Sequence, residues 1–367
     1  MLTIIPPGLH FDFVAWAKQA IILSALVIVI GLVSIVVRGG LNLGIDFSGG
    51  TLLQLRFSES AEINAIRDVL GKLKLGNSVV QHFGEDREVL IRVPEVATEQ
   101  ADIGSQVQEA LKAKFPGQTI ELRRAEVVGP QVSADLRRQA LFALFYAILG
   151  IVIYISGRFE AKWFAAVGLA VVLFVVTYAI TQWLPRVAPT ILIIVALLGA
   201  IVFCLFLQLQ YALAAILALF HDVLITVGFF SLLDKPFNLP IVAALLTIVG
   251  YSLNDTIIVF DRIRENMHGQ RREQFAETVN LSINQTLSRT VLTSGTTLLV
   301  VAALFVFGGE VIHDFAFALL IGIVVGTYSS IFVASPLLVF WNGSARVQGL
   351  SLVPRGTSDN RRRAQRT

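Results

Sequence analysis

The sequence predicts a polytopic α-helical membrane protein that carries one small α+β domain of the ferredoxin-like type. The composition is the first reason: among 367 residues, 55% are hydrophobic and 15% are charged, and the mean hydropathy is +0.73. A soluble domain carries about 25% charged residues. The second reason is a series of uncharged runs of the length that spans a bilayer as a helix, about 20 residues. The third is one long polar segment, residues 38–138, in which strand and helix patterns alternate.

The composition also excludes several function classes. The net charge is only +3, and the basic residues lie mostly beside apolar runs, so we do not expect nucleic acid as a partner. The single cysteine, Cys204, lies within an apolar run and cannot form a disulfide framework or a cysteine metal site within one chain. Neither an ATP-binding Gly-x-x-x-x-Gly-Lys-Ser/Thr loop nor a His-Glu-x-x-His motif occurs. We therefore expect no enzyme activity, no cofactor and no metal.

Eight spans are expected when the uncharged runs are divided at turns. Residues 19–37 are longer than the apolar core of a cleavable signal peptide, so they are expected to form the first span. The run 187–220 is too long for one helix and is expected to turn at residues 207–211. The predicted segments are a cytoplasmic N-terminus (1–18), the first helix (19–37), an outer domain (38–138), a hairpin (139–185), a second hairpin (186–233), a helix with Asp255 (234–260), a basic cytoplasmic loop or helix (261–284), two last helices (285–341) and a cytoplasmic tail (342–367).

The distribution of arginine and lysine sets the predicted orientation, because cytoplasmic loops carry an excess of these residues. With both termini inside, the inner segments hold most of the basic residues, and the short outer loops hold only Arg186 and Lys235. Removing one span would break this pattern, whereas removing a pair would keep it, so six spans stay an open alternative. Residues 352–356, LVPRG, match a thrombin-cleavage linker, and the tail is left out of the functional reasoning.

The outer segment predicts a βαββαβ order. Strands are expected at 51–57, 78–84, 88–94 and 119–128, and helices at 62–72 and 98–114, with a Gly-Glu-Asp turn between the second and third strands. This order is typical of a ferredoxin-like sandwich. His82 stands alone in the segment and is expected to be structural. We therefore interpret the domain as a binding or docking module rather than a catalytic one.

Three charged positions lie inside the predicted spans: Asp255 beside Asn254, Asp222 beside His221, and Arg289. A charge at the bilayer centre costs about 2.5 kcal/mol or more, and it usually faces the bundle interior or water. Asp255 and Arg289 lie at comparable depth on consecutive antiparallel helices. They are therefore expected to pair.

Two polar stripes support this pairing. One helix is expected to present Thr247, Tyr251 and Asn254/Asp255, and the next helix Gln285, Arg289, Thr293 and Thr296/Thr297. If the stripes face each other, they form a hydrated path or a proton site. Small residues are expected to allow close helix packing at Gly295, Gly322 and Gly326.

Each charge also has a structural interpretation. Arg289 could snorkel to the cytoplasmic surface, Asp255 could cap a helix that starts at Thr256, and Asp222 could form a satisfied pair with His221. Their grouping in three adjacent spans favours a shared function. A carboxylate that exchanges an arginine partner for a proton has two charge states. Moving one charge through the membrane potential yields about 2.3 kcal/mol per 100 mV, so such a device can drive movement of the outer domain.

Several long stretches resemble one known family and occur in that family's order. They are LNLGIDFSGGTLLQLRF, VVGPQVSADLRRQA, LFHDVLITVGFFSLL, TIVGYSLNDTIIVFDRIREN, NQTLSRTVLTSGTTL and LIGIVVGTYSSIFVASPL. They are similar to the SecF family, whose members are partners of SecD in the bacterial Sec export machinery and resemble halves of RND-superfamily transporters. The resemblance covers most of the chain, and it implies an RND-like half-bundle with a periplasmic domain.

The resemblance implies roles for particular residues. Asp255 and Arg289, together with Asn254 and Asp222, match the intramembrane positions that the family uses for proton coupling. The signature Gly-Ile-Asp-Phe-x-Gly-Gly at the start of the outer domain is matched by Gly44, Asp46, Phe47, Gly49 and Gly50. The implied function is proton-motive-force-dependent help with late steps of protein translocation in the bacterial plasma (inner) membrane. The implied partners are SecD, a SecYEG-type translocon, a YidC-type insertase, translocating unfolded polypeptide and membrane lipid.

One region departs from the family. SecF is expected to have six spans, whereas additional apolar residues separate Arg158 from His221 here. An offset of 49 residues aligns Leu149-Gly150 with Leu198-Gly199, which suggests a duplicated hairpin.

Two other functions stay open: an RND-type exporter of small molecules or lipids, and a translocon scaffold without energy coupling. A single outer domain leaves little room for a substrate pocket, which disfavours the exporter. Whether the coupling ion is a proton or sodium also stays open, as does the stoichiometry with SecD.

Overall fold

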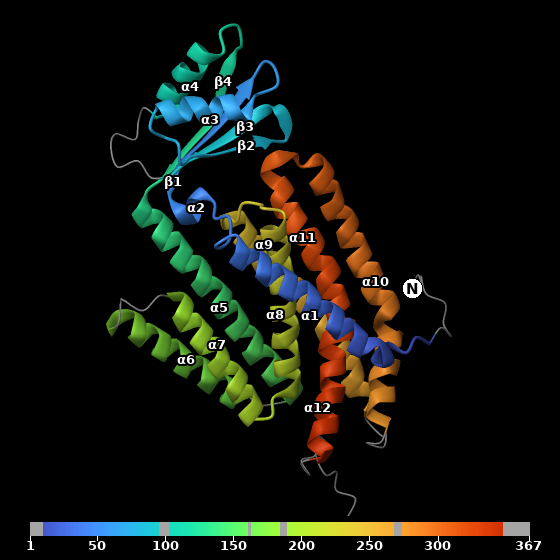
Figure 1. Ribbon diagram of the computed structural model, residues 1–367. Helices are drawn as coiled ribbons and strands as arrows, with labels where there is room; N and C mark the ends of the chain where they lie inside the picture. The colour runs from blue at the N-terminus through green and yellow to red at the C-terminus, as the bar shows by residue number, and fades with distance from the viewer. Residues whose placement is uncertain (1–9, 95–102, 161–162, 184–188, 268–273, 348–367) are drawn as a thin grey trace, which may run out of the picture.

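The computed structural model describes residues 10–94, 103–160, 163–183, 189–267 and 274–347. It has two parts: a small sheet domain, and a bundle of long helices with that domain at one end (Figure 1). The tail predicted at 342–367 lies mostly outside the described residues.

The sheet domain has the βαββαβ order that the sequence predicts. Its strands are β1 (Gly50–Phe57), β2 (Val79–Phe83), β3 (Glu85–Val93) and β4 (Ile120–Val128), paired antiparallel in the order β2-β3-β1-β4. Helices α3 (Ile63–Lys72) and α4 (Ile103–Lys114) pack on one face of the sheet. Because strand side chains alternate between faces, Leu53 and Leu55 of β1 enter this core while Leu52 and Gln54 lie on the opposite face.

The turn between β2 and β3 is tighter than the predicted Gly-Glu-Asp turn. Gly84 alone separates the strands and has a φ of +71°, which glycine adopts without steric cost. Residues 85 and 86 belong to β3. The predicted start of the second helix, at residue 98, lies outside the described residues.

Long helices make up the rest of the chain. They are α1 (Phe13–Val37), α5 (Pro130–Glu160), α6 (Trp163–Trp183), α7 (Pro189–Phe206), α8 (Gln210–Leu232), α9 (Leu239–Asn266), α10 (Phe275–Phe307), α11 (Gly309–Ser329), the π-helix η2 (Ser330–Ala334) and α12 (Ser335–Val347), with the short α2 (Ile45–Ser48) between α1 and the sheet. The described residues of the polar segment predicted at 261–284 include the end of α9, up to Asn266, and the start of α10, from Phe275.

Six of the described helical stretches are long and apolar enough to cross a membrane: α1, α5, α8, α9, α10 and the run Ile312–Trp341. Helices α6 and α7 form a further pair beside α5 on one flank of the bundle (Figure 1). The chain turns between α7 and α8 at Gln208, within the turn predicted at 207–211, with a φ of +56°. The count of eight spans stays a prediction for α6 and α7.

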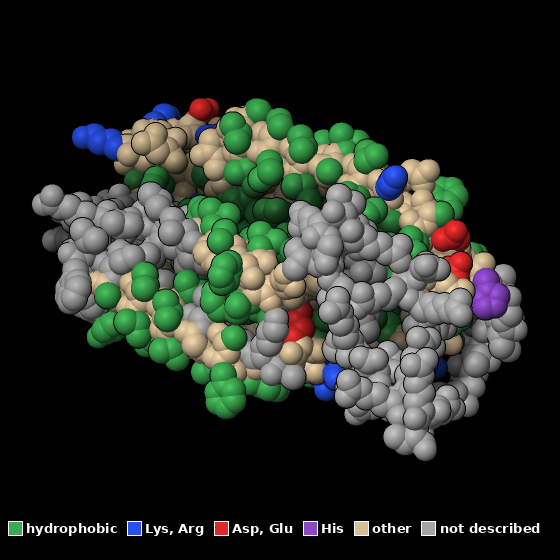
Figure 2. All heavy atoms as spheres, turned by 90° about the horizontal axis from the view of Figure 1, so that it is seen from below, with side chains coloured by type: hydrophobic (Ala, Val, Ile, Leu, Met, Phe, Trp, Pro, Cys, Tyr) green, Lys and Arg blue, Asp and Glu red, His purple; other side chains and the backbone are tan. Residues whose placement is uncertain are grey.

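The outer surface of the bundle is apolar, and its interior is polar at a few positions. Large hydrophobic side chains such as Phe164 and Phe307 are exposed, and green side chains cover much of the described surface in Figure 2. Helices that contact lipid are expected to have such a surface. The most buried of these six stretches are α8, α9 and the run Ile312–Trp341, which form the centre of the bundle.

Glycines bring particular helices close together. A Cβ on Gly322 of α11 would overlap Ile248 of α9, and one on Gly326 would lie 2.9 Å from Ser252 Cβ, so both predicted packing positions are confirmed. Gly295 was also expected at a helix contact, but a Cβ there would have no atom of the described residues within 4 Å.

Candidate functional site

Asp255 lies in the centre of the bundle, on α9, with 1% of its surface exposed. The Ser294 hydroxyl of α10 donates a hydrogen bond to Asp255 Oδ2 over 3.1 Å. Thr327 of α11 in turn donates to Ser294 Oγ over 2.8 Å. Three helices therefore meet at this carboxylate through a short chain of hydroxyl groups.

Arg289 is close enough to attract the Asp255 carboxylate electrostatically. However, no ion pair joins the two side chains among the described residues, and Arg289 lies on the exposed side of α10. Helical geometry explains this, because Arg289 and Ser294 are five positions apart, which separates them by about 140° around the helix axis. The predicted direct pair is therefore replaced by longer-range attraction, and Ser294 occupies the contact position.

The buried polar stripe of α10 differs from the predicted one. Gln285 and Thr296 are exposed. The buried row instead has a serine or threonine at every fourth position, the spacing of a ridge on a helix surface. It consists of Thr278, Ser282, Thr286, Thr290 and Ser294. Sequence inspection missed this row, although its regular spacing is a signal that could have identified it.

The hydroxyl row contains one unpartnered group. Ser282 and Thr286 donate to backbone carbonyls one turn earlier, whereas Thr290 Oγ1 is buried and has no hydrogen-bond partner among the described residues. Thr290 lies one turn before Ser294. The row thus leads along α10 from its polar end to the Asp255 site.

Asp222 forms a second buried carboxylate site on α8, with 0% of its surface exposed. Its Oδ1 lies 2.8 Å from His221 Nδ1, and its Oδ2 accepts hydrogen bonds from Ser252 Oγ at 2.5 Å and Ser329 Oγ at 2.9 Å. His221 Nε2 is buried and has no partner in the described part of the chain, and the ring stacks on Tyr328. The predicted His221 pair is present, but it is one part of a larger network.

The two carboxylate sites share helices. Ser252 and Asp255 both lie on α9, and their three-residue separation corresponds to about 4.5 Å along the axis. Ser329 and Thr327, which serve the two sites, both lie at the end of α11, immediately before η2. π-helical turns occur frequently at functional sites. Asn254, by contrast, is exposed, so the structure does not bring it into either site.

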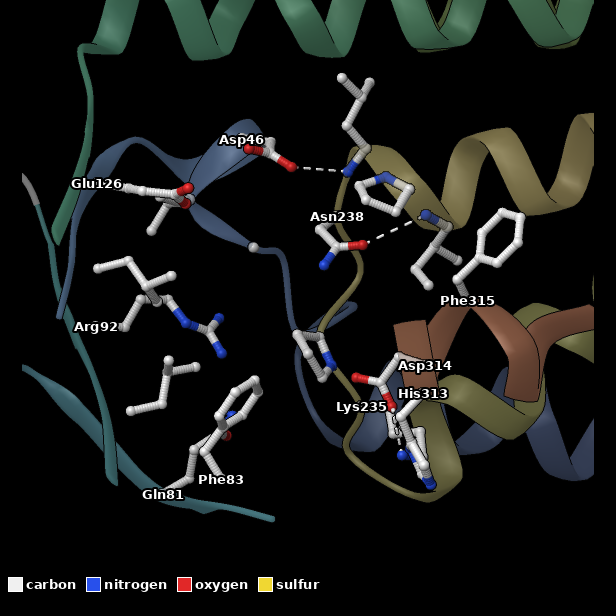
Figure 3. Close-up of a pocket in the computed structure, with 18 of the residues that line it drawn as sticks. Asp46, Gln81, Phe83, Arg92, Glu126, Lys235, Asn238, His313, Asp314 and Phe315 are labelled. Carbon is white, nitrogen blue, oxygen red and sulfur yellow. Dashed lines mark hydrogen bonds and ion pairs between the residues drawn. The ribbon is translucent and has the colours of Figure 1, made fainter. Parts of the chain in front are cut away.

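The signature residues lie at the junction between the sheet domain and the bundle. Asp46 Oδ2 accepts a hydrogen bond from the backbone N–H of Leu239 over 2.8 Å (Figure 3). Leu239 begins α9, so the carboxylate stabilises the positive end of that helix dipole. Phe47 is buried beside Phe237, which precedes α9. The signature is thereby attached to the helix that carries Asp255.

The signature glycines allow close backbone contacts. Gly49 and Gly50 have φ values of +74° and +111°, and a Cβ on Gly50 would overlap the Val93 carbonyl oxygen of β3. Gly44 has an ordinary φ, and its N–H donates to the Phe237 carbonyl over 2.8 Å. Positions 49 and 50 therefore require glycine for their backbone conformation. Gly44 instead packs closely against the segment that leads into α9.

Two family models match the chain. "Protein export membrane protein SecD/SecF, C-terminal" matches residues 106–205 and 180–344, and "SecD/SecF GG Motif" matches residues 33–61. The two matches of the first model overlap at 180–205, within the region where the sequence predicts an additional hairpin.

Similar proteins share the same description. "Protein translocase subunit SecF" of Desulfurispirillum indicum is 44% identical over 90% of this chain and 92% of its own length. The protein of the same description from Magnetococcus marinus is 45% identical over 92% of this chain and 94% of its own length. The crystal structure of SecDF from Thermus thermophilus superposes with a TM-score of 0.68 and 34% identity, covering 92% of this chain and 39% of that longer chain. The chain therefore belongs to the SecF family of protein translocase subunits, and it is a multi-pass membrane protein.

Proposed function

We propose that the chain is a proton-motive-force-coupled accessory subunit of the Sec translocon and that it acts together with SecD. One observation carries this proposal: Asp255 is a buried carboxylate with a hydroxyl partner and an arginine within electrostatic range, but without an ion pair to any described residue. A carboxylate in this setting can gain or lose a proton while its neighbours rearrange. Aspartate paired tightly to arginine would be held in one charge state.

The energy available to such a site is sufficient for mechanical work. One charge that crosses the membrane potential yields about 2.3 kcal/mol per 100 mV. Changes at Asp255 reach the sheet domain through α9, whose first residue is bonded to Asp46. The proton is the proposed coupling ion, because the hydroxyl groups around Asp255 can relay it.

The proposed orientation and partners follow from the distribution of basic residues and from the SecF family. Both termini lie in the cytoplasm, the sheet domain lies outside the plasma membrane, and the partners are SecD, a SecYEG-type translocon and a YidC-type insertase. The client is unfolded polypeptide in the late steps of translocation. The end of α9 away from the sheet domain carries Arg262 and Arg264, as the positive-inside rule expects.

Export of a secreted reporter in cells that carry Asp255→Asn tests the proposal. We expect loss of export with unchanged expression and unchanged co-purification with SecD. Asp261→Asn is the matched control, because Asp261 lies on the same helix but is half-exposed and paired with Arg158 at 2.5 Å. Normal export by the Asp255 variant would reduce this carboxylate to a structural charge and would favour the scaffold function.

A further inference from the structure

A cavity of about 650 Å³ lies between the sheet domain and the nearest ends of the helices. Its wall on one side is the face of the sheet that α3 and α4 leave uncovered, including Leu52 and Phe83. The opposite wall is the segment before α9 and the start of α11, including Asn238 and Phe315 (Figure 3). The volume is in the range of small-ligand sites, about 300–1,000 Å³.

Arg92 of β3 points into this cavity (Figure 3). It is only 8% exposed, and its Nη1 donates to Asn42 Oδ1 over 2.9 Å and to the Leu43 carbonyl over 2.8 Å. Both acceptors are neutral. Its Nη2 is buried and has no hydrogen-bond partner among the described residues. Burial lowers the pKa of Arg92, and nearby Asp234 partly opposes this change, but an arginine remains charged at physiological pH.

The charges around the cavity do not balance at Arg92. Two other cations on the wall have carboxylate partners: Arg124 pairs with Glu126 at 2.5 Å, and Lys235 pairs with Asp314 at 2.6 Å. Asp234 is the carboxylate that acts electrostatically on Arg92, but it forms an ion pair with Arg38 at 3.2 Å. Two guanidinium groups therefore share one carboxylate. Asp46, the fourth carboxylate on the wall, accepts the Leu239 N–H, so the missing partner is a local property of Arg92 and not a net charge of the cavity.

We propose that this cavity binds an acidic side chain of an extended polypeptide segment, with the carboxylate on Arg92. The assignment rests on the proposed function, in which unfolded polypeptide emerges on this side of the membrane. A carboxylate would supply the missing acceptor at Nη2, and charge-assisted bonds to arginine are the strongest class of protein hydrogen bond. The apolar walls, formed by Leu52, Phe83 and Phe315, accept the neighbouring side chains of the segment.

Two fluorescent peptides test the proposal on the full chain in nanodiscs of zwitterionic lipid. Both peptides have apolar residues at alternate positions. They differ only at the central residue, which is Asp in one and Asn in the other. Fluorescence anisotropy should show at least about tenfold tighter binding of the Asp peptide, the effect of one charge-assisted contact. Equal affinity of the two peptides for the unaltered protein would overturn the proposal.

Matched variants assign the effect to Arg92. Arg92→Gln should abolish the preference for the Asp peptide, whereas Arg124→Gln should retain it, because Arg124 is already paired with Glu126. Leu52→Glu is a second test that leaves the bonds of Arg92 to the α1–α2 segment intact, and its new carboxylate should compete with the peptide. The assignment would be contradicted if Arg92→Gln and Arg124→Gln lost the preference for the Asp peptide equally, or if Leu52→Glu retained that preference.

Nanodiscs with an anionic lipid test whether the anion bound by Arg92 is a lipid phosphate rather than a peptide carboxylate. Nanodiscs that contain phosphatidylglycerol should leave the preference for the Asp peptide unchanged. If it disappears there, a lipid phosphate occupies Arg92 and the peptide assignment is wrong. The binding measurement requires no proton gradient, so Asp255→Asn should retain the preference. Failure of peptide binding is thereby separate from failure of proton coupling.

Discussion

The two buried carboxylates differ in how firmly their surroundings hold them. Asp222 has His221 on one oxygen and two serine hydroxyl groups on the other. Asp255 has one hydroxyl partner, Ser294, and its charge partner acts from a distance. We therefore expect Asp222 to fix the arrangement of α8, α9 and α11, while Asp255 is the group that changes state.

Ser294→Ala should weaken export without removing the carboxylate. The variant takes away the described hydrogen bond to Asp255, and a bond to a charged group contributes about 1.5–3 kcal/mol. The rate of reporter export should fall about tenfold or more if that bond aligns Asp255 in the working state. Thr296→Ala is the control, because Thr296 is exposed on the same helix. Equal rates in the two variants would show that the hydroxyl has no role in coupling.

Gly50→Ala should destabilise the sheet domain more than Gly117→Ala does. Both positions have φ above +100°, which costs an alanine about 1–3 kcal/mol. Only at Gly50 would the new methyl group also overlap the Val93 carbonyl oxygen, since nothing lies within 4 Å at Gly117. Thermal unfolding in detergent measures the difference, and equal midpoints would mean that the strand shifts to admit the methyl group.

At the scale of helices, glycine spacing decides which elements approach most closely. Gly322 and Gly326 are four residues apart on α11 and face Ile248 and Ser252 of α9. This contact brings Ser252 and Ser329 together at Oδ2 of the Asp222 carboxylate. Close packing of α9 and α11 is therefore a condition for the polar network, and not only for stability.

Gly322→Val should disrupt this contact and lower both stability and export. Its side chain would overlap Ile248, and inserting extra methyl groups into a packed site costs about 1–3 kcal/mol. Gly295→Val is the matched control, with open space at its Cβ position. Thermal unfolding of both purified variants should show a lower midpoint for Gly322→Val alone. A similar loss in both would trace the effect to helix propensity, and the α9–α11 contact would then not be limiting.

Sequence patterns predicted elements better than they predicted faces. Hydropathy identified the long helices, and strand alternation identified the βαββαβ order. The prediction of which face of α10 points inward was wrong, because it started from Arg289 and assumed that a charge points into the bundle. In the structure the hydroxyl row ending at Ser294 points inward instead. The role of Asp46 depends on a contact with Leu239 across 193 residues, which no local pattern reports.

At the scale of the whole molecule, α9 connects the sheet domain with the carboxylate sites. Asp46 binds its first residue, and Asp255 lies sixteen residues later, about 24 Å along the helix axis. A rigid helix transmits a small shift at one end to the other. If the coupling works in this way, a defect at Asp46 and a defect at Ser294 should affect the same step.

A double-mutant cycle tests this connection. Asp46→Asn keeps an oxygen that can accept the Leu239 N–H but removes the charge, which is worth about 0.3–1 kcal/mol at a helix N-terminus. The export defect of Asp46→Asn combined with Ser294→Ala should be smaller than the product of the single defects, because the two changes impair one movement of α9. Asp46→Asn combined with Thr296→Ala should show the independent product. If the Ser294 pair is also independent, the sheet domain receives its motion through another element, and α5, which leads from β4 into the bundle, becomes the next helix to test.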